Sequence, residues 1–176
     1  DVDSFIITAK NRLWLARLWA IAAAKLLRVH RSRKDVRVSG KACLNMFFDE
    51  QNVTIPKHKQ SLYTAHEVAQ MRLIDMRGGA YYYRLFIQSD RWIRTYFPNI
   101  RMVRLSKDEV VYRHDHHLNL GILGGLMEKI AKTIQYSKMS SHITNEIVTN
   151  TQLWFFPKDF GKKITRHLGA ASSPSR

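Results

Sequence analysis

The densest group of side chains with potential for chemistry is His114-Asp115-His116-His117, three imidazoles and a carboxylate in one run. Imidazole and carboxylate groups are common ligands of zinc and other divalent ions. Successive residues of a strand point to opposite faces, so only the His114 and His116 pair could reach one ion. No further ligand motif stands near the run, which favours a polar loop between a strand and a helix. We therefore predict no metal site and no cofactor.

Three further motifs carry weaker chemical signals. Arg77-Gly78-Gly79 precedes an expected helix and could offer backbone N–H groups to a phosphate, but it lacks the spacing of a nucleotide-binding loop. The consecutive tyrosines 81–83 could stack on bases, although three neighbours on a helix cannot share one face. The single cysteine, Cys43, has apolar neighbours and is predicted to be a buried structural thiol. No arrangement with the spacing of a catalytic triad or a carboxylate pair is present, so we predict a protein that is not an enzyme.

The charge of the chain points to a polyanionic partner. The 176 residues hold 29 Lys and Arg against 14 Asp and Glu, a net charge of +15. Such an excess favours nucleic acid, an anionic membrane face or an acidic protein as partner. The densest cationic run spans residues 28–37, and it has more cations than a helix dipole needs. We predict RNA phosphate contacts at Arg28, Arg31, Arg33, Lys34, Arg37, Lys57, Lys59, Arg77, Lys162, Lys163 and Arg166.

The N-terminal part, residues 1–69, is predicted to be a long helix followed by a basic extension. The helix is expected over residues 4–29, with Ser4 as its N-cap. At helical spacing, Lys10, Arg17, Lys25 and Arg28 form one stripe that should face water or phosphate. The remaining surface is apolar from residue 13 onward and should pack on neighbours, but its cations argue against a membrane span. Contacts with partner proteins are predicted at Trp14, Trp19, Trp154, Phe155 and Phe156.

The central part, residues 70–137, has the clearest order of elements. Strands are expected over 70–76, 100–105 and 109–114, and helices over 80–97 and 122–136. In the last helix an apolar face should cover the sheet, made of Leu123, Leu126, Met127, Ile130 and Ile134. This order predicts an α/β sandwich, with Phe47 and Phe48 anchored on its core and residues 138–176 as a C-terminal basic extension.

The sequences MRLIDMR, GGA, YYYRLFIQSDRWIRTYF, PNIRMVRL, EVVYRH and ILGGLMEKIAKTI carry a resemblance to a known family. In this order they resemble the compact thioredoxin-like domain shared by mitochondrial ribosomal proteins and an accessory subunit of respiratory complex I. The resemblance covers residues 70–137. Two departures stand out: Pro98-Asn99 reverses the family's order, and the central part lacks the cysteine pair of the complex I subunit. The resemblance therefore implies a thioredoxin-like fold without a redox role.

These observations lead to two main hypotheses, with a metal-dependent enzyme built on His114 and His116 as a third. The first is a structural, non-catalytic subunit of the mitochondrial ribosome, on the matrix side, with rRNA and ribosomal proteins as partners. A chain that starts at Asp1 instead of Met fits removal of a targeting leader. The alternative is an accessory subunit of a respiratory complex, whose first helix lies against a membrane or a partner helix and whose cations meet anionic lipid.

Overall fold

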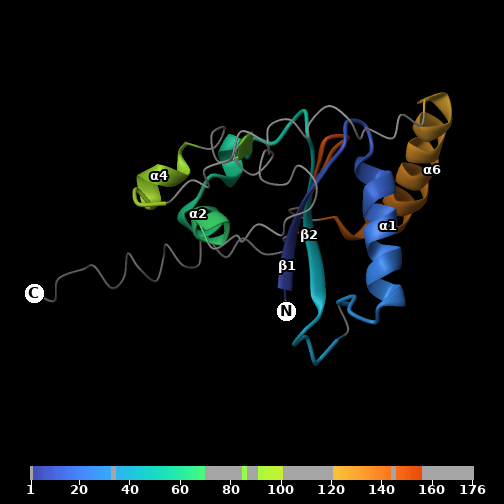
Figure 1. The fold of residues 1–176 in the computed structure, drawn as a ribbon, viewed down its shortest axis with the longest axis horizontal. Coiled ribbons are helices and arrows are strands. Elements are labelled where there is room, and N and C mark those ends of the chain that lie inside the picture. Colours follow the sequence, from blue (N-terminus) through green and yellow to red (C-terminus); the bar gives the residue numbers. More distant parts are fainter. Residues whose placement is uncertain are drawn as a thin grey trace, which may run out of the picture. The chain divides into compact units, whose positions relative to one another are not determined.

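The computed structural model describes residues 2–32, 35–69, 85–86, 91–100, 121–143 and 146–155. The chain is mixed α/β and divides into two compact units (Figure 1). Unit 1 consists of residues 1–52 and 117–157, and unit 2 consists of residues 53–116 and 158–176. The mixed α/β class expected from the sequence is confirmed at this level.

Unit 1 is built on a four-stranded mixed sheet. Strand β1 (Val2–Thr8) pairs in parallel with β2 (Ala42–Asp49), and β4 (Gln152–Trp154) pairs antiparallel with both β2 and β3 (Ile147–Val148). The strand order is therefore β1-β2-β4-β3. On one face, the rings of Phe5 and Phe48 meet edge-on at 4.9 Å, and Phe48 lies 5.3 Å from the ring of Trp154.

The first strand corrects the prediction of a helix over residues 4–29. Residues 2–8 are extended, so Ser4 lies inside β1 and caps no helix. The segment VDSFIIT is rich in β-branched and aromatic residues, and its backbone groups pair along the whole of β2. This long-range pairing outweighs the local helical spacing of the cations.

Helix α1 (Leu13–Leu26) confirms the helix predicted over 4–29 for residues 13–26 alone. Leu13, Trp14 and Leu15 are buried in one cluster with Phe47, Ala131 and Leu153. Phe47 and Phe48 are both fully buried, which confirms the prediction that they anchor on the core. The core of unit 1 thus joins the first turn of α1, the middle of β2, one residue of β4 and one residue of α6.

Helix α6 (Gly121–Met139) confirms the helix predicted over 122–136, and a short 3-10 turn, η2 (Ser140–His142), follows it. It packs along α1 (Figure 1). The prediction of its inner face is wrong, because Gly124, Ala131 and Gln135 are buried there. The side chains expected to cover the sheet are exposed instead: Leu123, Leu126, Met127, Ile130 and Ile134.

Unit 2 contains the 3-10 turn η1 (Lys57–Lys59), helix α2 (Leu62–Ala69) and helix α4 (Ile93–Tyr96). Its buried apolar side chains among the described residues are Val53, Ile55, Ala65, Val68, Phe86 and Ile93. Helix α4 ends before Pro98, as the sequence predicts, but residues 91–92 form a turn, so the helix predicted over 80–97 is not continuous. The strands predicted over 70–76 and 109–114 lie outside the described residues, and so does the strand predicted over 100–105 apart from Ile100.

Candidate polyanion-binding loop and exposed helix face

The basic run predicted to contact RNA is the loop that joins α1 to β2, residues 28–41. At the end of α1, the backbone N–H groups of Val29 and His30 both donate to the carbonyl of Ala24, at 2.9 and 3.0 Å. Further on, the N–H of Arg31 donates to the carbonyl of Ala42 at 3.0 Å, and the N–H of Ala42 returns a bond to Val29 at 2.7 Å. The loop therefore starts and ends at the same point beside β2, although its sequence shows no regular period.

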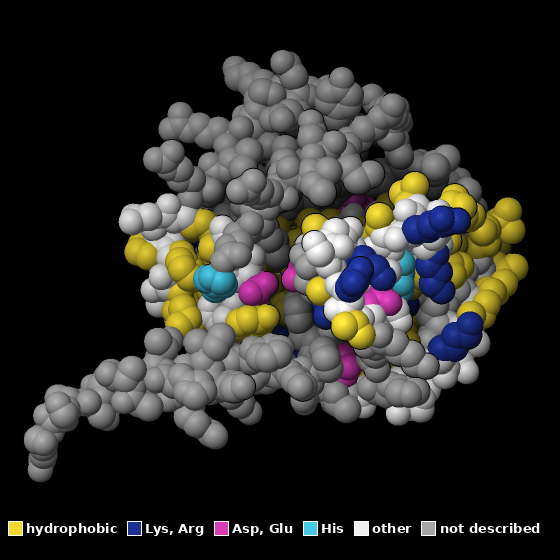
Figure 2. Space-filling model, turned by 90° about the horizontal axis from the view of Figure 1, so that it is seen from below, with side chains coloured by type: hydrophobic (Ala, Val, Ile, Leu, Met, Phe, Trp, Pro, Cys, Tyr) yellow, Lys and Arg dark blue, Asp and Glu magenta, His cyan; other side chains and the backbone are white. Residues whose placement is uncertain are grey.

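The one acidic residue of this loop, Asp35, is engaged within the loop itself. Its Oδ2 accepts the N–H of Ser32 at 2.7 Å and lies 2.8 Å from the Nζ of Lys41. The hydrogen bonds from Lys41 and Ser32 hold the pKa of Asp35 below its usual range. Arg28, Arg31 and Arg37 are all exposed on the same loop. Figure 2 shows Lys and Arg side chains gathered on this part of unit 1.

A line of polar contacts connects the loop to the sheet. The Nη1 of Arg31 donates to the Sγ of Cys43 at 3.4 Å, and the thiol of Cys43 donates to the Oδ1 of Asn45 at 2.5 Å. The amide of Asn45 in turn donates to the carboxylate of Asp3, on β1. Cys43 is half-buried, and burial raises the pKa of its thiol. A protonated thiol is a poor nucleophile, and the prediction of a buried thiol is met only in part because Cys43 is half-buried.

Helix α1 does not present the full cationic stripe predicted for it. Lys10, Lys25 and Arg28 are exposed, but Arg17 is turned into unit 1. Its Nη1 donates to the Oε1 of Gln135 at 2.5 Å, and its guanidinium carbon lies 4.5 Å from the ring centroid of Phe155. Burial lowers the pKa of Arg17 to about 10, which leaves it charged at neutral pH. Arg17 therefore ties α1 to α6 and is not available to phosphate.

The other predicted RNA contacts are spread through the chain. In unit 2, Lys57 is exposed and Lys59 is partly buried, both in η1. The remaining residues of that set lie outside the described residues: Arg33, Lys34, Arg77, Lys162, Lys163 and Arg166. The structure thus brings together Arg28, Arg31 and Arg37 on one loop.

The predicted protein contacts divide between core and surface. Trp14 is 1% exposed and Trp154 is 2% exposed, so the prediction of a contact surface is wrong for these two residues. Both fill space against β2, where a large apolar side chain gains most from burial. Phe155 is partly buried under Arg17, whereas Trp19 is 64% exposed. Phe156 lies outside the described residues.

Two residues of α6 that the sequence analysis missed hold α1 in place. The Oε1 and Oε2 of Glu128 accept the N–H groups of Trp14 and Leu15 at 2.8 and 2.9 Å. The Nε2 of Gln135 donates to the carbonyl of Trp14 at 2.7 Å. A carboxylate at a helix N-terminus satisfies free N–H groups and complements the helix dipole. The spacing of small and polar residues at 124, 128, 131 and 135 is the sequence signal for this inner face.

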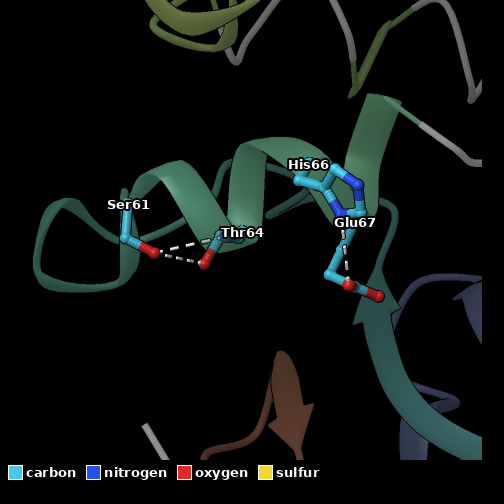
Figure 3. Close-up of polar contacts among 4 residues, drawn as sticks. All are labelled: Ser61, Thr64, His66 and Glu67. Atoms are coloured by element: carbon cyan, nitrogen blue, oxygen red, sulfur yellow. Dashed lines mark hydrogen bonds and ion pairs between the residues drawn. The ribbon is translucent and has the colours of Figure 1, made fainter. Parts of the chain in front are cut away.

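The hydroxyl, imidazole and carboxylate groups of α2 form a helix cap and a separate ion pair (Figure 3). The Oγ of Ser61 accepts the N–H of Thr64 at 3.2 Å, and the Oγ1 of Thr64 donates to the carbonyl of Lys59 at 2.7 Å. The Nδ1 of His66 lies 3.6 Å from Oε1 of Glu67 and points away from Ser61 (Figure 3). Among the four residues drawn in Figure 3, Ser61 therefore serves as a helix cap, and His66 contacts a carboxylate.

Within the described part of the chain, no group of three or more His, Cys, Asp and Glu side chains is placed to hold a metal ion. The run His114 to His117 lies outside that part. None of the described helices has the length and apolar character needed to cross a membrane. Comparison with family models, with curated proteins and with solved structures found no significant match.

Proposed function

We propose that the chain is a non-catalytic structural subunit of the mitochondrial ribosome, in which the loop of residues 28–41 neutralises rRNA phosphates. The observation that carries this proposal is the exposure of Arg28, Arg31 and Arg37 on a loop held at both ends. The loop's own carboxylate is already paired with Lys41, within the loop. Contacts of this kind position a protein on RNA without reading its bases.

The backbone of Arg28 gives independent support. It has a φ of 59°, in the left-handed region, at the position after a helix where glycine is usual. A residue with a Cβ costs about 1 kcal/mol in this conformation. Such strain tends to be retained where the side chain has a task. A phosphate contact that needs the guanidinium supplies a reason for arginine at this position.

The choice of the mitochondrial ribosome rests on the resemblance of residues 70–137 to the thioredoxin-like domain of its subunits. Under this proposal the protein works on the matrix side. Trp19, which is 64% exposed on α1, would then contact a neighbouring ribosomal protein. A large exposed aromatic side chain is typical of such an anchor.

The direct test is sedimentation of the tagged protein from detergent-solubilised mitochondria, with and without ribonuclease. We expect the protein to travel with ribosomal particles and to shift after digestion. Replacing Arg28, Arg31 and Arg37 by glutamine should release it from these particles. The matched control replaces the same number of cations on α6, Lys129, Lys132 and Lys138. Equal release by the two variants would leave the loop without a specific role and would contradict the proposal.

RNA affinity measured by fluorescence anisotropy gives a second readout. Each phosphate contact contributes about 0.7–0.9 to the slope of log affinity against log salt. Losing three such contacts should therefore reduce that slope by roughly 2–3 for the loop variant. An unchanged slope would place the phosphate contacts elsewhere in the chain.

A second candidate function is an accessory subunit of a respiratory membrane complex. The observation that favours it is the row of exposed apolar side chains on α6, because a free protein rarely leaves such a face in water. The first helix is a poorer candidate for this role than the sequence suggested, since Trp14 belongs to the core. Sedimentation with a respiratory complex, insensitive to ribonuclease, would support this candidate over the ribosomal one.

A further inference from the structure

Helix α6 carries an apolar stripe on the side that faces away from α1. Its members are 36–94% exposed: Ile122, Leu123, Leu126, Met127, Ile130 and Ile134. At about 100° per residue they span an arc of roughly 140°, which also contains the exposed Thr133 and Ser137 and lies opposite Glu128 and Gln135. The stripe is thus the long face of a helix whose other face is already bound to α1.

The charges around the apolar stripe are positive. Glu128 is the one acidic residue of α6, and its carboxylate faces inward to the backbone of α1. The exposed Lys129 and Lys138 border the stripe on opposite sides, and Tyr136, 45% exposed, lies on the same edge as Lys129, two turns further along α6.

We propose that the apolar stripe of α6 docks on the surface of an anionic membrane. The apolar side chains enter the boundary between headgroups and acyl chains, and the bordering lysines contact lipid phosphates. Lysine stems follow the apolar surface while their ammonium groups stay at the headgroups, and tyrosine favours the same depth. The helix lies in the plane of the surface and does not cross it, in agreement with its length and hydropathy.

Charge complementarity selects this occupant over a second copy of the chain. Two copies joined through the stripe would bring the bordering lysines of one against those of the other, with no acidic side chain of α6 to pair with them. A lipid surface offers anionic groups on both sides of the helix at once. The proposal goes beyond a role in RNA binding, because its residues are separate from the loop of residues 28–41.

Flotation of the full chain with vesicles tests the proposal. The vesicles contain phosphatidylcholine alone or phosphatidylcholine mixed with phosphatidylglycerol. We expect binding to the mixed vesicles, weakened about tenfold or more by the double variant Leu126→Ser and Ile130→Ser. The matched control is Leu26→Ser with Leu27→Ser, which removes two more exposed leucines at the end of α1 and should keep wild-type binding. Circular dichroism checks that both variants remain folded.

Adsorption of a basic protein by charge alone has to be separated from insertion of the stripe. A Leu123→Trp variant should show a blue shift and quenching by brominated lipid, relative to the wild type and to a Leu26→Trp control. Equal losses in the two serine variants, or no quenching at position 123, would overturn the proposal. The proposal would also be overturned if the wild type were a dimer and the Leu126→Ser and Ile130→Ser variant a monomer that still floats with the vesicles. RNA affinity should be unchanged in the stripe variants, so failure here is distinct from failure of the RNA proposal.

Discussion

Replacing Glu128 with alanine removes the carboxylate through which α6 caps the first turn of α1. Its two oxygens accept the N–H groups of Trp14 and Leu15, which have no partner within their own helix. Arg12, the residue before α1, provides no side-chain cap, so no substitute is present at this end. In the Glu128→Ala variant both N–H groups lose a charged acceptor in a partly buried place.

The size of the effect follows from these two bonds. A hydrogen bond to a charged group contributes about 1.5–3 kcal/mol, and two bonds to one carboxylate share part of that energy. We therefore expect Glu128→Ala to lower the free energy of unfolding by about 3 kcal/mol. A domain of this size loses about 2–4 °C in Tm per kcal/mol, which gives a decrease of about 6–12 °C. Glu128→Gln keeps the shape and one acceptor, so it should lose about half as much.

Thermal unfolding followed by far-UV circular dichroism measures this decrease, and urea unfolding gives the free energy directly. Lys129→Ala is the matched control, because it changes the next residue of α6 on an exposed site and should stay within about 0.5 kcal/mol of the wild type. If the Glu128→Ala variant has the same Tm and free energy of unfolding as the Lys129→Ala control, the argument that α6 caps α1 is refuted.

Three further predictions concern the loop after α1 and the strand that follows it. Burial, followed by the charge of Lys25, lowers the pKa of His30 below its ordinary 6.5, so the folded chain binds this proton more weakly than the unfolded chain. The contribution of His30 to the free energy of unfolding should therefore be fully present above pH 6.5 and be lost as the pH falls through the folded pKa. Urea unfolding at a series of pH values should show a shallower decline for the His30→Gln variant than for the wild type. Arg28→Gly should raise the free energy of unfolding by about 0.5–1 kcal/mol and yet weaken RNA binding; a loss of stability would contradict the strained backbone. Burial raises the pKa of Cys43, so iodoacetamide at neutral pH should modify it more slowly in the folded chain than in urea, and equal rates would disprove this.

The sequence predicted elements well where a local pattern and the tertiary structure agree. Helices over 13–26 and 121–139 follow from their helical spacing, and Phe47 and Phe48 form part of the core as expected. The prediction for residues 2–8 failed because pairing with β2, some forty residues away, decides their conformation. A pattern read within one window does not contain that partner.

The prediction of the inner face of α6 failed for a different reason. Hydrophobic periodicity assumes that the most apolar face turns inward, and it placed Leu126 and Ile130 in the core. In the structure, the small side chains of Gly124 and Ala131 lie on the buried side, and Glu128 supplies acceptors for the free N–H groups of α1. The energy of a capped helix end depends on a neighbour that the sequence does not identify. A helix can therefore keep its apolar side outward when its polar side has a specific task inside.

The two proposed surfaces lie at different places on unit 1 and respond to different physics. The loop of residues 28–41 follows the C-terminal end of α1, whereas Glu128 on α6 holds the N-terminal end of the same helix. Helix α1 has 14 residues, so these ends are about 20 Å apart, and the effects of substitutions at the two ends on the free energy of unfolding should be additive.

Arginine contacts with RNA weaken steeply with salt. Burial of apolar side chains in a lipid surface does not depend on ionic screening, so part of the vesicle binding should persist at salt concentrations that release RNA. If added salt abolished both to the same extent, charge alone would explain vesicle binding, and the apolar stripe would need another role.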